Sequence, residues 1–564
     1  MCGIFGCISQ QPQNLIQKTL QGLKVLEYRG YDSAGIAYQD TSQKMSAIKT
    51  IKSVGEISNL RQKIKKPPIT TVCIGHTRWA TNGAVNLQNS HPHLSFNKEI
   101  AVVHNGIIEN YQACCTQLQS HQINLKTPVD TEIIPNILYL LQQNKHNIHD
   151  FLQGQYVFCA IENNHKSLFI AKKGNLPLYI GRDQQTTYVT SDTLALPSTV
   201  TQIITLENLE TCEVTSSSLT FYKQAKIIKK DWQTFHQFFI PSDKNGFATY
   251  MEKEIHEIPD IMQRIITSYT NNKIIKNLKQ QFQKLIKNID CIHLCGCGTS
   301  YHAALILSQV FEKELRIRSI PHVSSELSSD TLLSEKAIAI VISQSGETAD
   351  TLACMDTLSK HQIPIVALCN VTTSTIAQRS QITFPLLCGP EIAVASTKVF
   401  CAALLVGHLI IKKLPVVDYT KFINETQQIL KDARQILPLP QDIPDKIFII
   451  GKNLNYGLAL EAALKIKEVT YLHCEGFPAH ELKHGPLAMV NQKTLAIAIG
   501  KNTENAAAEI QARGGKIIHI PNRDNPLSFI YQIIPAQILA LDLAQKLGIN
   551  PDKPRNLAKS VTVL

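Results

Sequence analysis

Short apolar runs separated by Gly, Pro and Asn dominate the first part of the chain. A run such as residues 100–104 is only a few residues long and rich in β-branched side chains, which favours a strand over a helix. Further on, apolar side chains recur every three or four residues from Ile255 to Ile265, which is helical spacing. The pattern therefore predicts a strand-rich domain over 1–230 with a few helices, followed by a helical connector over 231–275.

Strands and helices alternate after the connector. Apolar strands over 290–294 and 337–342 each lead through a short polar loop into a segment of helical spacing. Such alternation predicts a parallel, doubly wound α/β sheet. The same arrangement recurs later in the chain, so we expect two copies of one unit, over 276–418 and 440–553, with a short tail over 554–564.

The chain has 564 residues and a formal net charge of +11, from 56 Lys and Arg against 45 Asp and Glu. This length exceeds what one hydrophobic core sustains, so several domains are expected. The densest basic clusters, at 63–66 and 226–230, contain no aromatic side chains, and solvated surface explains them better than a nucleic-acid site. We expect no nucleic-acid partner, while a preference for anionic metabolites stays open.

The chain has 15 cysteines but no CxxC pair. Cys291, Cys295 and Cys297 lie close together, yet they lack a zinc-site spacing and a fourth ligand, so buried free thiols in a reducing compartment are expected, and no metal. The longest apolar run, 399–411, is too short to cross a bilayer and favours a core helix. Because no signal-peptide pattern follows Met1, we expect a cytoplasmic protein without a membrane partner.

The second residue is the first candidate for chemistry. Removal of Met1 would leave Cys2 with a thiol and an α-amine on one residue. An amine that titrates near pH 8 is neutral often enough to take the thiol proton, so a single residue would supply both nucleophile and base. Cys2 alone, however, is more simply an ordinary second residue.

Several downstream residues change that balance. Arg78 has a planar guanidinium that suits a substrate carboxylate. Asn105 and the N–H of Gly106 follow a strand and could both face a tetrahedral oxyanion. Asp130 could pair with an α-ammonium group. Each has a plain structural explanation, such as a surface ion pair for Arg78 or a helix cap for Asp130, but together they favour a glutamine site.

These segments resemble the N-terminal-nucleophile (class II) glutamine amidotransferases, as do residues 27–35 (EYRGYDSAG) and 91–93 (HPH). The resemblance implies an α+β N-terminal-nucleophile glutaminase domain in which Cys2 is the nucleophile and Asn105 with Gly106 forms the oxyanion hole. It also implies residues that bind L-glutamine or line its pocket, which are Arg78, Trp79, Thr81, His91 and Asp130.

Two hydroxyl-rich loops connect predicted strands to predicted helices within 276–418. One contains Thr299 and Ser300, and the other is 343–348 (SQSGET). Hydroxyl and N–H groups at helix N-termini can hold a phosphate dianion, although Ser and Thr also cap helices without binding any ligand. Neither loop has a Walker lysine or a GxGxxG pattern, so a nucleotide cofactor is not expected.

The 343–348 string resembles the signature of sugar isomerase (SIS) domains. This resemblance implies two α/β doubly wound SIS domains, the first of which binds a sugar phosphate. The implied phosphate-binding residues are Thr299, Ser300, Ser343, Gln344, Ser345 and Thr348.

An enzyme that joins a glutaminase to a sugar isomerase could move nitrogen onto a ketose and release an aldose. Such a reaction requires an amine, a carboxylate base and a proton shuttle. Glu461, Lys465 and Glu468 fall on one helical face, although such a set is usually a surface of charge pairs. His484 and Lys559 are further candidates, with a turn residue and a solvated tail as their plain alternatives.

These segments, together with residues 391–398 (EIAVASTK), resemble the isomerising glutamine:fructose-6-phosphate aminotransferases over nearly the whole chain. The resemblance implies that Lys559 forms a Schiff base with fructose 6-phosphate, that Glu468 moves a proton between C1 and C2 with help from Lys465, and that His484 opens the ring. It further implies an ammonia channel gated by Trp79, a homodimer, and no metal, nucleotide or other cofactor.

The sequence departs from the family pattern at three positions, with Asn82 in place of a common His, Ala393 in place of Gly and Leu564 in place of Glu. None of these departures removes a residue assigned to chemistry. Two other functions would use parts of this pattern, an amidophosphoribosyltransferase with the same glutaminase and a sugar-phosphate-sensing regulator. The paired SIS pattern argues against the first, and a regulator would have no use for Cys2 or Lys559.

Overall fold

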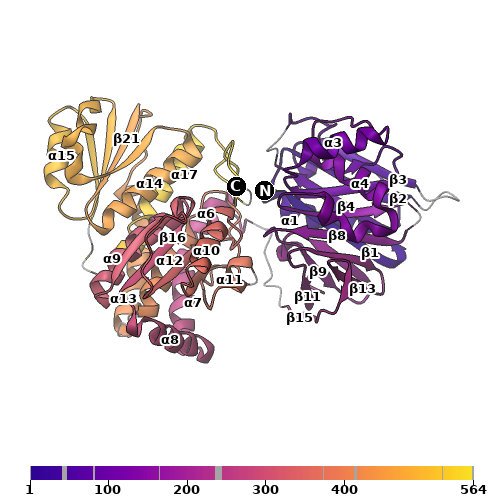
Figure 1. Cartoon of the computed structure of the whole chain (residues 1–564). Coiled ribbons are helices and arrows are strands. Elements are labelled where there is room, and N and C mark those ends of the chain that lie inside the picture. Colours follow the sequence, from indigo (N-terminus) through magenta and orange to yellow (C-terminus); the bar gives the residue numbers. More distant parts are fainter. Residues whose placement is uncertain are drawn as a thin grey trace. The chain divides into compact units, whose positions relative to one another are not determined.

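The computed structural model describes residues 2–40, 47–79, 83–163, 165–235, 244–372, 374–411, 416–521, 523 and 525–561 (Figure 1). The chain divides into two compact units. The first is Met1–Ser242 with Ser560–Leu564, and the second is Asp243–Lys559.

The first unit contains two antiparallel sheets. Its strands are β1 (Gly3–Gln13), β2 (Ser33–Asp40), β3 (Ala47–Val54), β4 (Thr70–Arg78), β5 (His93–Leu94), β6 (Ile100–Gly106), β7 (Tyr156–Glu162), β8 (Ser167–Lys173), β9 (Tyr179–Arg182), β10 (Thr186–Thr190), β11 (Gln202–Thr205), β12 (Glu210–Thr215), β13 (Leu219–Lys223), β14 (Lys226–Ile228) and β15 (Gln233–Thr234). The strand orders are β15-β11-β9-β10-β1-β4-β2-β3 and β14-β13-β12-β8-β7-β6-β5.

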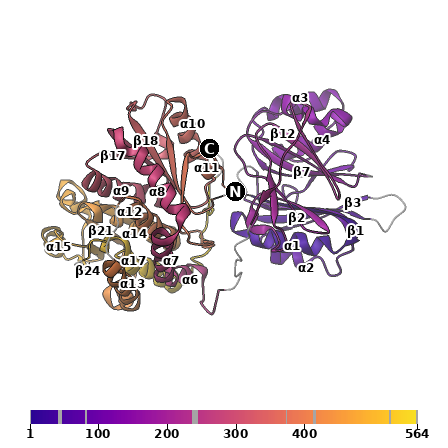
Figure 2. The ribbon, with the colours of Figure 1, turned by 90° about the horizontal axis from the view of Figure 1, so that it is seen from below.

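Helices cover the outer faces of these sheets. They are α1 (Leu15–Leu26), α2 (Ile57–Gln62), α3 (Tyr111–Ser120), α4 (Ile133–Leu141) and α5 (Ile148–Phe151), with 3-10 turns η1 (Glu27–Arg29), η2 (Asp130–Glu132), η3 (Gln142–Asn147) and η4 (Thr193–Ala195). Figure 2 shows α1 and α2 on one side of the stacked sheets and α3 and α4 on the other. The unit is therefore a four-layer sandwich of helices, sheet, sheet and helices.

Strand β1 shows how the sequence builds these layers. Alternate side chains of a strand point to opposite faces. Ile4 and Ile8 enter the core between the two sheets, where they join Val103 of β6. Phe5 and Cys7 enter the core that α1 covers on the other face. Because both faces are buried over residues 3–8, this part of the strand has no charged or polar side chain, and its first residue pairs with Thr77 of β4.

The second unit contains two parallel sheets. Its strands are β16 (Cys291–Gly296), β17 (Arg318–Val323), β18 (Ala337–Ser343), β19 (Ile365–Cys369), β20 (Ile382–Pro385), β21 (Lys446–Gly451), β22 (Cys474–Pro478), β23 (Thr494–Ile499) and β24 (Lys516–Ile520). The orders are β17-β16-β18-β19-β20 and β22-β21-β23-β24. Each sheet thus begins with the second, first, third and fourth strand of its repeat, which confirms the predicted duplication.

The helices of this unit are α6 (Tyr250–His256), α7 (Ile258–Asn271), α8 (Lys273–Leu285), α9 (Thr299–Leu315), α10 (Ala349–Lys360), α11 (Thr375–Arg379), α12 (Lys398–Ile411), α13 (Val416–Ile436), α14 (Leu454–Thr470), α15 (Glu504–Gln511), α16 (Ser528–Tyr531) and α17 (Ile534–Lys546). The 3-10 turns are η5 (Ile286–Asn288), η6 (Ser324–Glu326), η7 (Ala479–His484) and η8 (Pro486–Met489).

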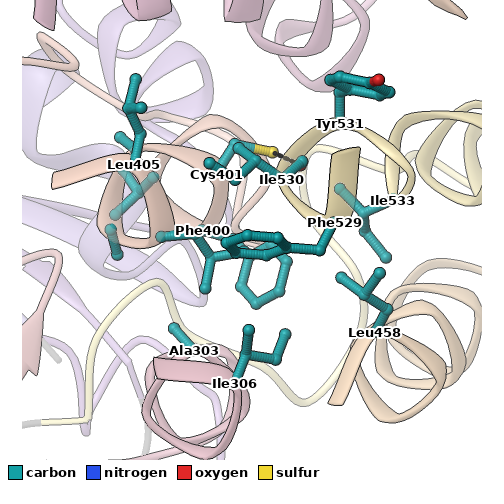
Figure 3. Close-up of a cluster of buried hydrophobic side chains, with 14 of the residues drawn as sticks. Ala303, Ile306, Phe400, Cys401, Leu405, Leu458, Phe529, Ile530, Tyr531 and Ile533 are labelled. Atoms are coloured by element: carbon teal, nitrogen blue, oxygen red, sulfur yellow. Dashed lines mark hydrogen bonds between the residues drawn. The ribbon is translucent and has the colours of Figure 1, made fainter. Parts of the chain in front are cut away.

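One hydrophobic core joins the two repeats. Helix α12 runs through it and is buried along nearly its whole length, which explains the long apolar run in the sequence and confirms the predicted core helix. Figure 3 shows Phe400 of this helix among Ile306, Leu458 and Phe529, which come from α9, α14 and α16. The core therefore fixes helices of both repeats against one another.

Helices α9 and α14 approach closely because α14 has a glycine at their contact. A Cβ atom on Gly457 would lie 2.4 Å from Cγ1 of Ile306, far inside contact distance. One turn further along α14, Glu461 then faces the first turn of α9, where Thr299 lies. The glycine thus brings polar groups of the two repeats within hydrogen-bond distance.

The residues predicted as a helical connector, 231–275, divide between the two units. Strand β15 pairs with β11 in the first unit. Helices α6 and α7 instead belong to the second unit, where Met251, Ile255 and Met262 enter the hydrophobic core. The helices are thus part of the domain that follows them, because their apolar faces are buried there.

Candidate active sites

The amino end of β1 brings Cys2 against the end of β4. Gly3 pairs with Thr77 across the two strands, and its N–H donates to the Thr77 hydroxyl at 3.1 Å. The Trp79 N–H in turn donates to Sγ of Cys2 at 3.2 Å. Burial raises the pKa of the Cys2 thiol, while the Trp79 N–H and the Arg78 guanidinium act to lower it. A partly buried thiol in this position needs a base at hand to become a nucleophile.

The end of β6 supplies the predicted oxyanion donors. Nδ2 of Asn105 donates to the carbonyl oxygen of Cys2 at 3.0 Å. Gly106 has a φ of 118°, and a Cβ atom there would lie 2.1 Å from the carbonyl oxygen of Gln155. Only glycine fits this backbone, which leaves an N–H without an obstructing side chain beside the Asn105 amide.

The predicted glutamine-binding residues are arranged around this corner. Arg78 is the last residue of β4 and is buried, which lowers the pKa of its guanidinium, although Cys2, Asp32 and Asp130 act to raise it. Asp130 accepts the N–H of Ile108 at 2.8 Å. Thr81 lies outside the residues that the structure describes, as does Asn82.

Three histidines that sequence reasoning left without a role pack beside His91. His91 stacks on His76 with ring centroids 4.0 Å apart, and His93 lies edge-on to His91 at 5.0 Å. Nδ1 of His91 accepts the N–H of His104 at 3.3 Å. Burial lowers the pKa of all four imidazoles below the ordinary value. His91 is thus part of a buried stack of neutral rings behind Asn105.

In the second unit, both predicted phosphate loops lie at one edge of the first parallel sheet. The loop before α9 follows β16, and the loop before α10 follows its neighbour β18, so both leave the carboxyl ends of adjacent strands. The Ser343 hydroxyl accepts the N–H of Gly346 at 2.9 Å, and a Cβ atom on Gly346 would meet Oγ of Ser374 at 1.8 Å. Gln344, Ser345 and Thr348 are half-buried in the second loop, whereas Ser300 is half-buried in the first turn of α9, which begins at Thr299.

The Thr299 hydroxyl is engaged by the second repeat. It donates to Oε1 of Glu461 at 3.0 Å and accepts from Nζ of Lys465 at 3.1 Å. Lys465 also pairs with Glu468 at 2.5 Å, and Glu461 accepts from His302 at 2.8 Å. Burial acts to lower the pKa of Lys465, but Glu461 and Glu468 outweigh it and raise that pKa. The predicted Glu/Lys face is therefore a buried network rather than a solvated surface.

Lys559 has a buried carboxylate partner that the sequence did not single out. Its Nζ lies 2.6 Å from Oε2 of Glu391, and the exposed fractions of the two side chains are 2% and 0%. Glu254 lies close by and accepts the N–H of Ile392. Burial raises the pKa of Glu254 to about 8, and the charge of Glu391 adds to that effect.

His484 is the remaining predicted residue of the sugar site. It ends η7 and is exposed, and within the described part of the chain no hydrogen bond or ion pair joins it to the other predicted residues. Its predicted part in ring opening stays a prediction. Among the described residues, no cluster of three or more His, Cys, Asp or Glu side chains is arranged to hold a metal ion.

The fold and the two groups of residues define a class of protein, in which a glutamine amidotransferase domain is joined to a pair of SIS domains. The glutamine amidotransferase domain family matches residues 76–198, and the SIS domain family matches residues 285–413 and 444–529. Among the described residues, every helix is too short or too polar to span a bilayer.

Relatives extend along the whole chain. A glutamine–fructose-6-phosphate aminotransferase (isomerizing) of Fusobacterium nucleatum subsp. nucleatum is 32% identical, and one of Buchnera aphidicola subsp. Baizongia pistaciae is 33% identical, each over 100% of both chains. The solved C-terminal domain of a glucosamine-fructose-6-phosphate aminotransferase from Francisella tularensis is 28% identical with a TM-score of 0.49, and the match covers 56% of this chain and 100% of that one. The chain belongs to the family of isomerising glutamine–fructose-6-phosphate aminotransferases.

Proposed function

We propose that this protein transfers the amide nitrogen of L-glutamine to fructose 6-phosphate and isomerises the product, which gives glucosamine 6-phosphate and glutamate. One observation carries the proposal: each unit holds the groups for one half of that reaction. The first unit places Cys2 beside Asn105, and the second pairs Lys559 with a buried carboxylate.

Glutamine is cleaved at Cys2. Once Met1 is removed, the new α-amine takes the thiol proton, and Sγ attacks the side-chain amide carbon. The carbonyl π electrons move to the oxygen, where the Asn105 amide and the Gly106 N–H bind the charge. The α-ammonium group then gives its proton to the amide nitrogen, and collapse of this intermediate breaks the C–N bond and releases ammonia. Water then hydrolyses the thioester to glutamate and restores the thiol.

The sugar phosphate reacts at Lys559. The phosphate occupies the two loops that follow β16 and β18, and the C2 carbonyl of the open-chain ketose condenses with the Lys559 amine and loses water. Lys559 must give up a proton before it attacks, and Glu391 is an acceptor at 2.6 Å. Ammonia then replaces the lysine at C2, which frees the amine.

Isomerisation follows at the Glu468–Lys465 pair. Glu468 takes a proton from C1 and returns it to C2, while the C1 hydroxyl loses its proton and the imine nitrogen gains one, so the C1 alcohol becomes an aldehyde and the C2 imine becomes an amine. Nζ of Lys465 lies 2.5 Å from Oε2 of Glu468 and holds this carboxylate in place. Ring opening by His484 and ammonia passage gated by Trp79 are further parts of the proposal that rest on the family resemblance.

The proposal is tested by an acceptor assay. The purified protein is given glutamine with either fructose 6-phosphate or glucose 6-phosphate, and glucosamine 6-phosphate and glutamate are quantified. We expect product only with fructose 6-phosphate, in equal amounts with glutamate. Release of glutamate without amino sugar would show that the protein is only a glutaminase. Release of neither product would refute the proposal. Sedimentation of the same sample tests the proposed homodimer, and cell fractionation tests the proposed cytoplasmic location.

A further inference from the structure

His76 lies on β4 beside the Asn105 amide. Its Nε2 atom is 3.0 Å from the carbonyl oxygen of His104 and 3.0 Å from Oδ1 of Asn105. The residue is 1% exposed, and its ring stacks on that of His91 with the planes 12° from parallel. A buried and stacked ring keeps one orientation, so both contacts are fixed features of the site.

The His104 carbonyl determines which ring nitrogen of His76 carries the proton. Burial lowers the pKa of His76 to about 3, so the ring is neutral at physiological pH and has a single N–H. A proton on Nδ1 would leave the Nε2 lone pair facing a carbonyl oxygen, which can only accept. The proton therefore lies on Nε2. Among the described residues, Nδ1 has no hydrogen-bond partner that would compete for it.

The same N–H determines how the Asn105 amide faces. Nε2–H is shared between the His104 carbonyl oxygen and the Asn105 amide, and only an oxygen of that amide can accept it. Oδ1 of Asn105 therefore points at His76 and Nδ2 points the other way, where it donates to the Cys2 carbonyl oxygen at 3.0 Å. Rotating the amide by half a turn would bring two donors together. It would also turn the amide oxygen toward the place where the oxyanion forms.

We propose that His76 is a positioning residue for glutamine cleavage, which holds the Asn105 amide with its N–H groups toward Cys2 and so keeps the oxyanion hole assembled before substrate binds. The inference deepens the proposed function and rests on it, because an oxyanion arises only if Cys2 attacks a glutamine amide. His76 acts through Asn105 and not on the thiol.

Three full-length variants test this inference. His76→Phe keeps a ring that can stack on His91 and removes the N–H, whereas His76→Gln supplies an amide N–H near the Nε2 position. His146→Phe is the matched control, because His146 also stacks on an aromatic ring of the same unit, that of Tyr222 at 3.6 Å, and is not part of the glutamine site. Steady-state glutamate release in the presence of fructose 6-phosphate gives kcat and KM. The rate of Cys2 alkylation by iodoacetamide, read from the Cys2 peptide, reports on the thiol alone.

We expect kcat of His76→Phe to fall about 100-fold, as when one oxyanion-hole donor is lost, with KM within about 3-fold of the parent. The His76→Gln variant should recover kcat to within about 10-fold, and the control should stay within about 2-fold. Cys2 alkylation should be unchanged throughout, since it forms no oxyanion.

A His76→Phe variant that retains its kcat would overturn the inference, as would one whose alkylation rate falls as far as its kcat. If that variant does not fold, His76→Asn, whose amide is too short to reach Asn105, takes its place with the same expected loss. In an Asn105→Ala background, His76→Phe should lower kcat no further, and an additional loss would contradict action through Asn105. A parent protein that releases no glutamate would instead refute the proposed function itself.

Discussion

At the scale of single residues, Glu391 connects the proposed Schiff-base lysine to the body of the second unit. Its Oε1 accepts the N–H groups of Thr397 and Val399, at the start of α12, and its Oε2 accepts from Lys559 and from Ser396. Burial acts to raise the pKa of Glu391, but the Lys559 ammonium and the N–H groups outweigh it and lower that pKa. Glu391 is therefore ionised at neutral pH, and the buried lysine has a counter-ion.

Replacing Glu391 by Gln should destabilise the second unit. The amide can still accept the N–H groups of α12, but it leaves the Lys559 ammonium buried without a counter-ion, which costs about 3–5 kcal/mol. The double variant Glu391→Gln, Lys559→Met should be more stable than Glu391→Gln alone, because it removes the unpaired charge as well. Urea denaturation followed by far-UV circular dichroism measures all three free energies of unfolding.

The pH dependence checks the cause of that loss. A carboxyl group with a lowered pKa in the folded state contributes stability above its unfolded pKa, and this contribution is lost as the pH falls through the folded value. The difference in free energy of unfolding between the parent and Glu391→Gln should therefore be largest above about pH 4.5 and become smaller below it. A difference that does not change with pH, or a double variant no more stable than the single one, would contradict the ion-pair explanation.

At the scale of elements, helix α6 supports the segment that carries Glu391. Glu254 of this helix accepts the N–H groups of Ile392 and Ala393. The first turn of α6 is in turn held by Asp552, which accepts the N–H groups of Tyr250 and Met251 at 2.9 and 2.8 Å. A helix predicted as a connector thus helps to position the proposed catalytic segment.

Replacing Glu254 by Gln should flatten part of the pH dependence of the second unit. With a folded pKa of about 8, Glu254 keeps a proton over a range in which the unfolded chain has lost it. Between about pH 4.5 and 8 the folded state therefore binds more protons, and Glu254 lowers stability by up to about 1.4 kcal/mol for each pH unit of rise. A glutamine side chain has no proton to lose. The free energy of unfolding of the variant, relative to that of the parent, should therefore increase across this pH range and stay constant above it.

Denaturation at a series of pH values measures this gain. Glu252→Gln, a change on the same helix, serves as the control. Its free energy of unfolding should change with pH at the same slope as that of the parent. If the free energy of unfolding of Glu254→Gln changes with pH as that of the parent does from pH 5 to about 8, Glu254 is ionised throughout this range. That result would contradict the inference that its carboxyl group is protonated in the folded protein.

The central strands of the second unit could be predicted from sequence because parallel strands buried on both faces are continuous apolar runs. The predicted strands over 290–294 and 337–342 match β16 (Cys291–Gly296) and β18 (Ala337–Ser343) to within two residues. The edge strands β17 and β22 contain Pro, His or Glu and have no such run, so the apolar pattern alone did not predict them.

The composition of the sites was harder to predict than the strands. Residue type and resemblance singled out Cys2, Asn105 and Lys559, but no spacing in the sequence connects them to their partners. Lys559 and Glu391 are 168 residues apart along the chain. His76 lies two residues before Arg78, yet its proposed positioning role depends on the His104 carbonyl, which only the folded structure brings to it.

At the scale of the whole molecule, the first unit has a pH dependence of its own. Burial lowers the pKa of each imidazole in the stack behind Asn105, and of two further histidines of this unit, His146 and His149. Between these lowered values and about pH 6.5 the unfolded chain binds more protons than the folded unit, so stability rises with pH. Each histidine contributes up to about 1.4 kcal/mol per pH unit in that range.

Tryptophan fluorescence isolates this effect, because the chain has 2 tryptophans and both, Trp79 and Trp232, belong to the first unit. We expect the urea midpoint seen by fluorescence to rise from pH 5 to 6.5 and to level off above that range. Replacing the stacked His91 by Phe should reduce the rise of this urea midpoint with pH. A midpoint that falls over the same range would mean that the folded unit holds charged imidazoles.

The two units should also be separable in their chemistry. Cys2→Ala removes the proposed nucleophile of the glutamine site, so it should lower glutamine-dependent synthesis by more than about 1000-fold. It should leave the conversion of fructose 6-phosphate to glucose 6-phosphate, which needs only groups of the second unit. Lys559→Met should do the reverse and spare glutamate release, because its amine takes part only in sugar chemistry. Both activities are measured on the same preparations, so equal loss of the two in either variant would contradict separate sites, whereas opposite losses would assign one half-reaction to each unit.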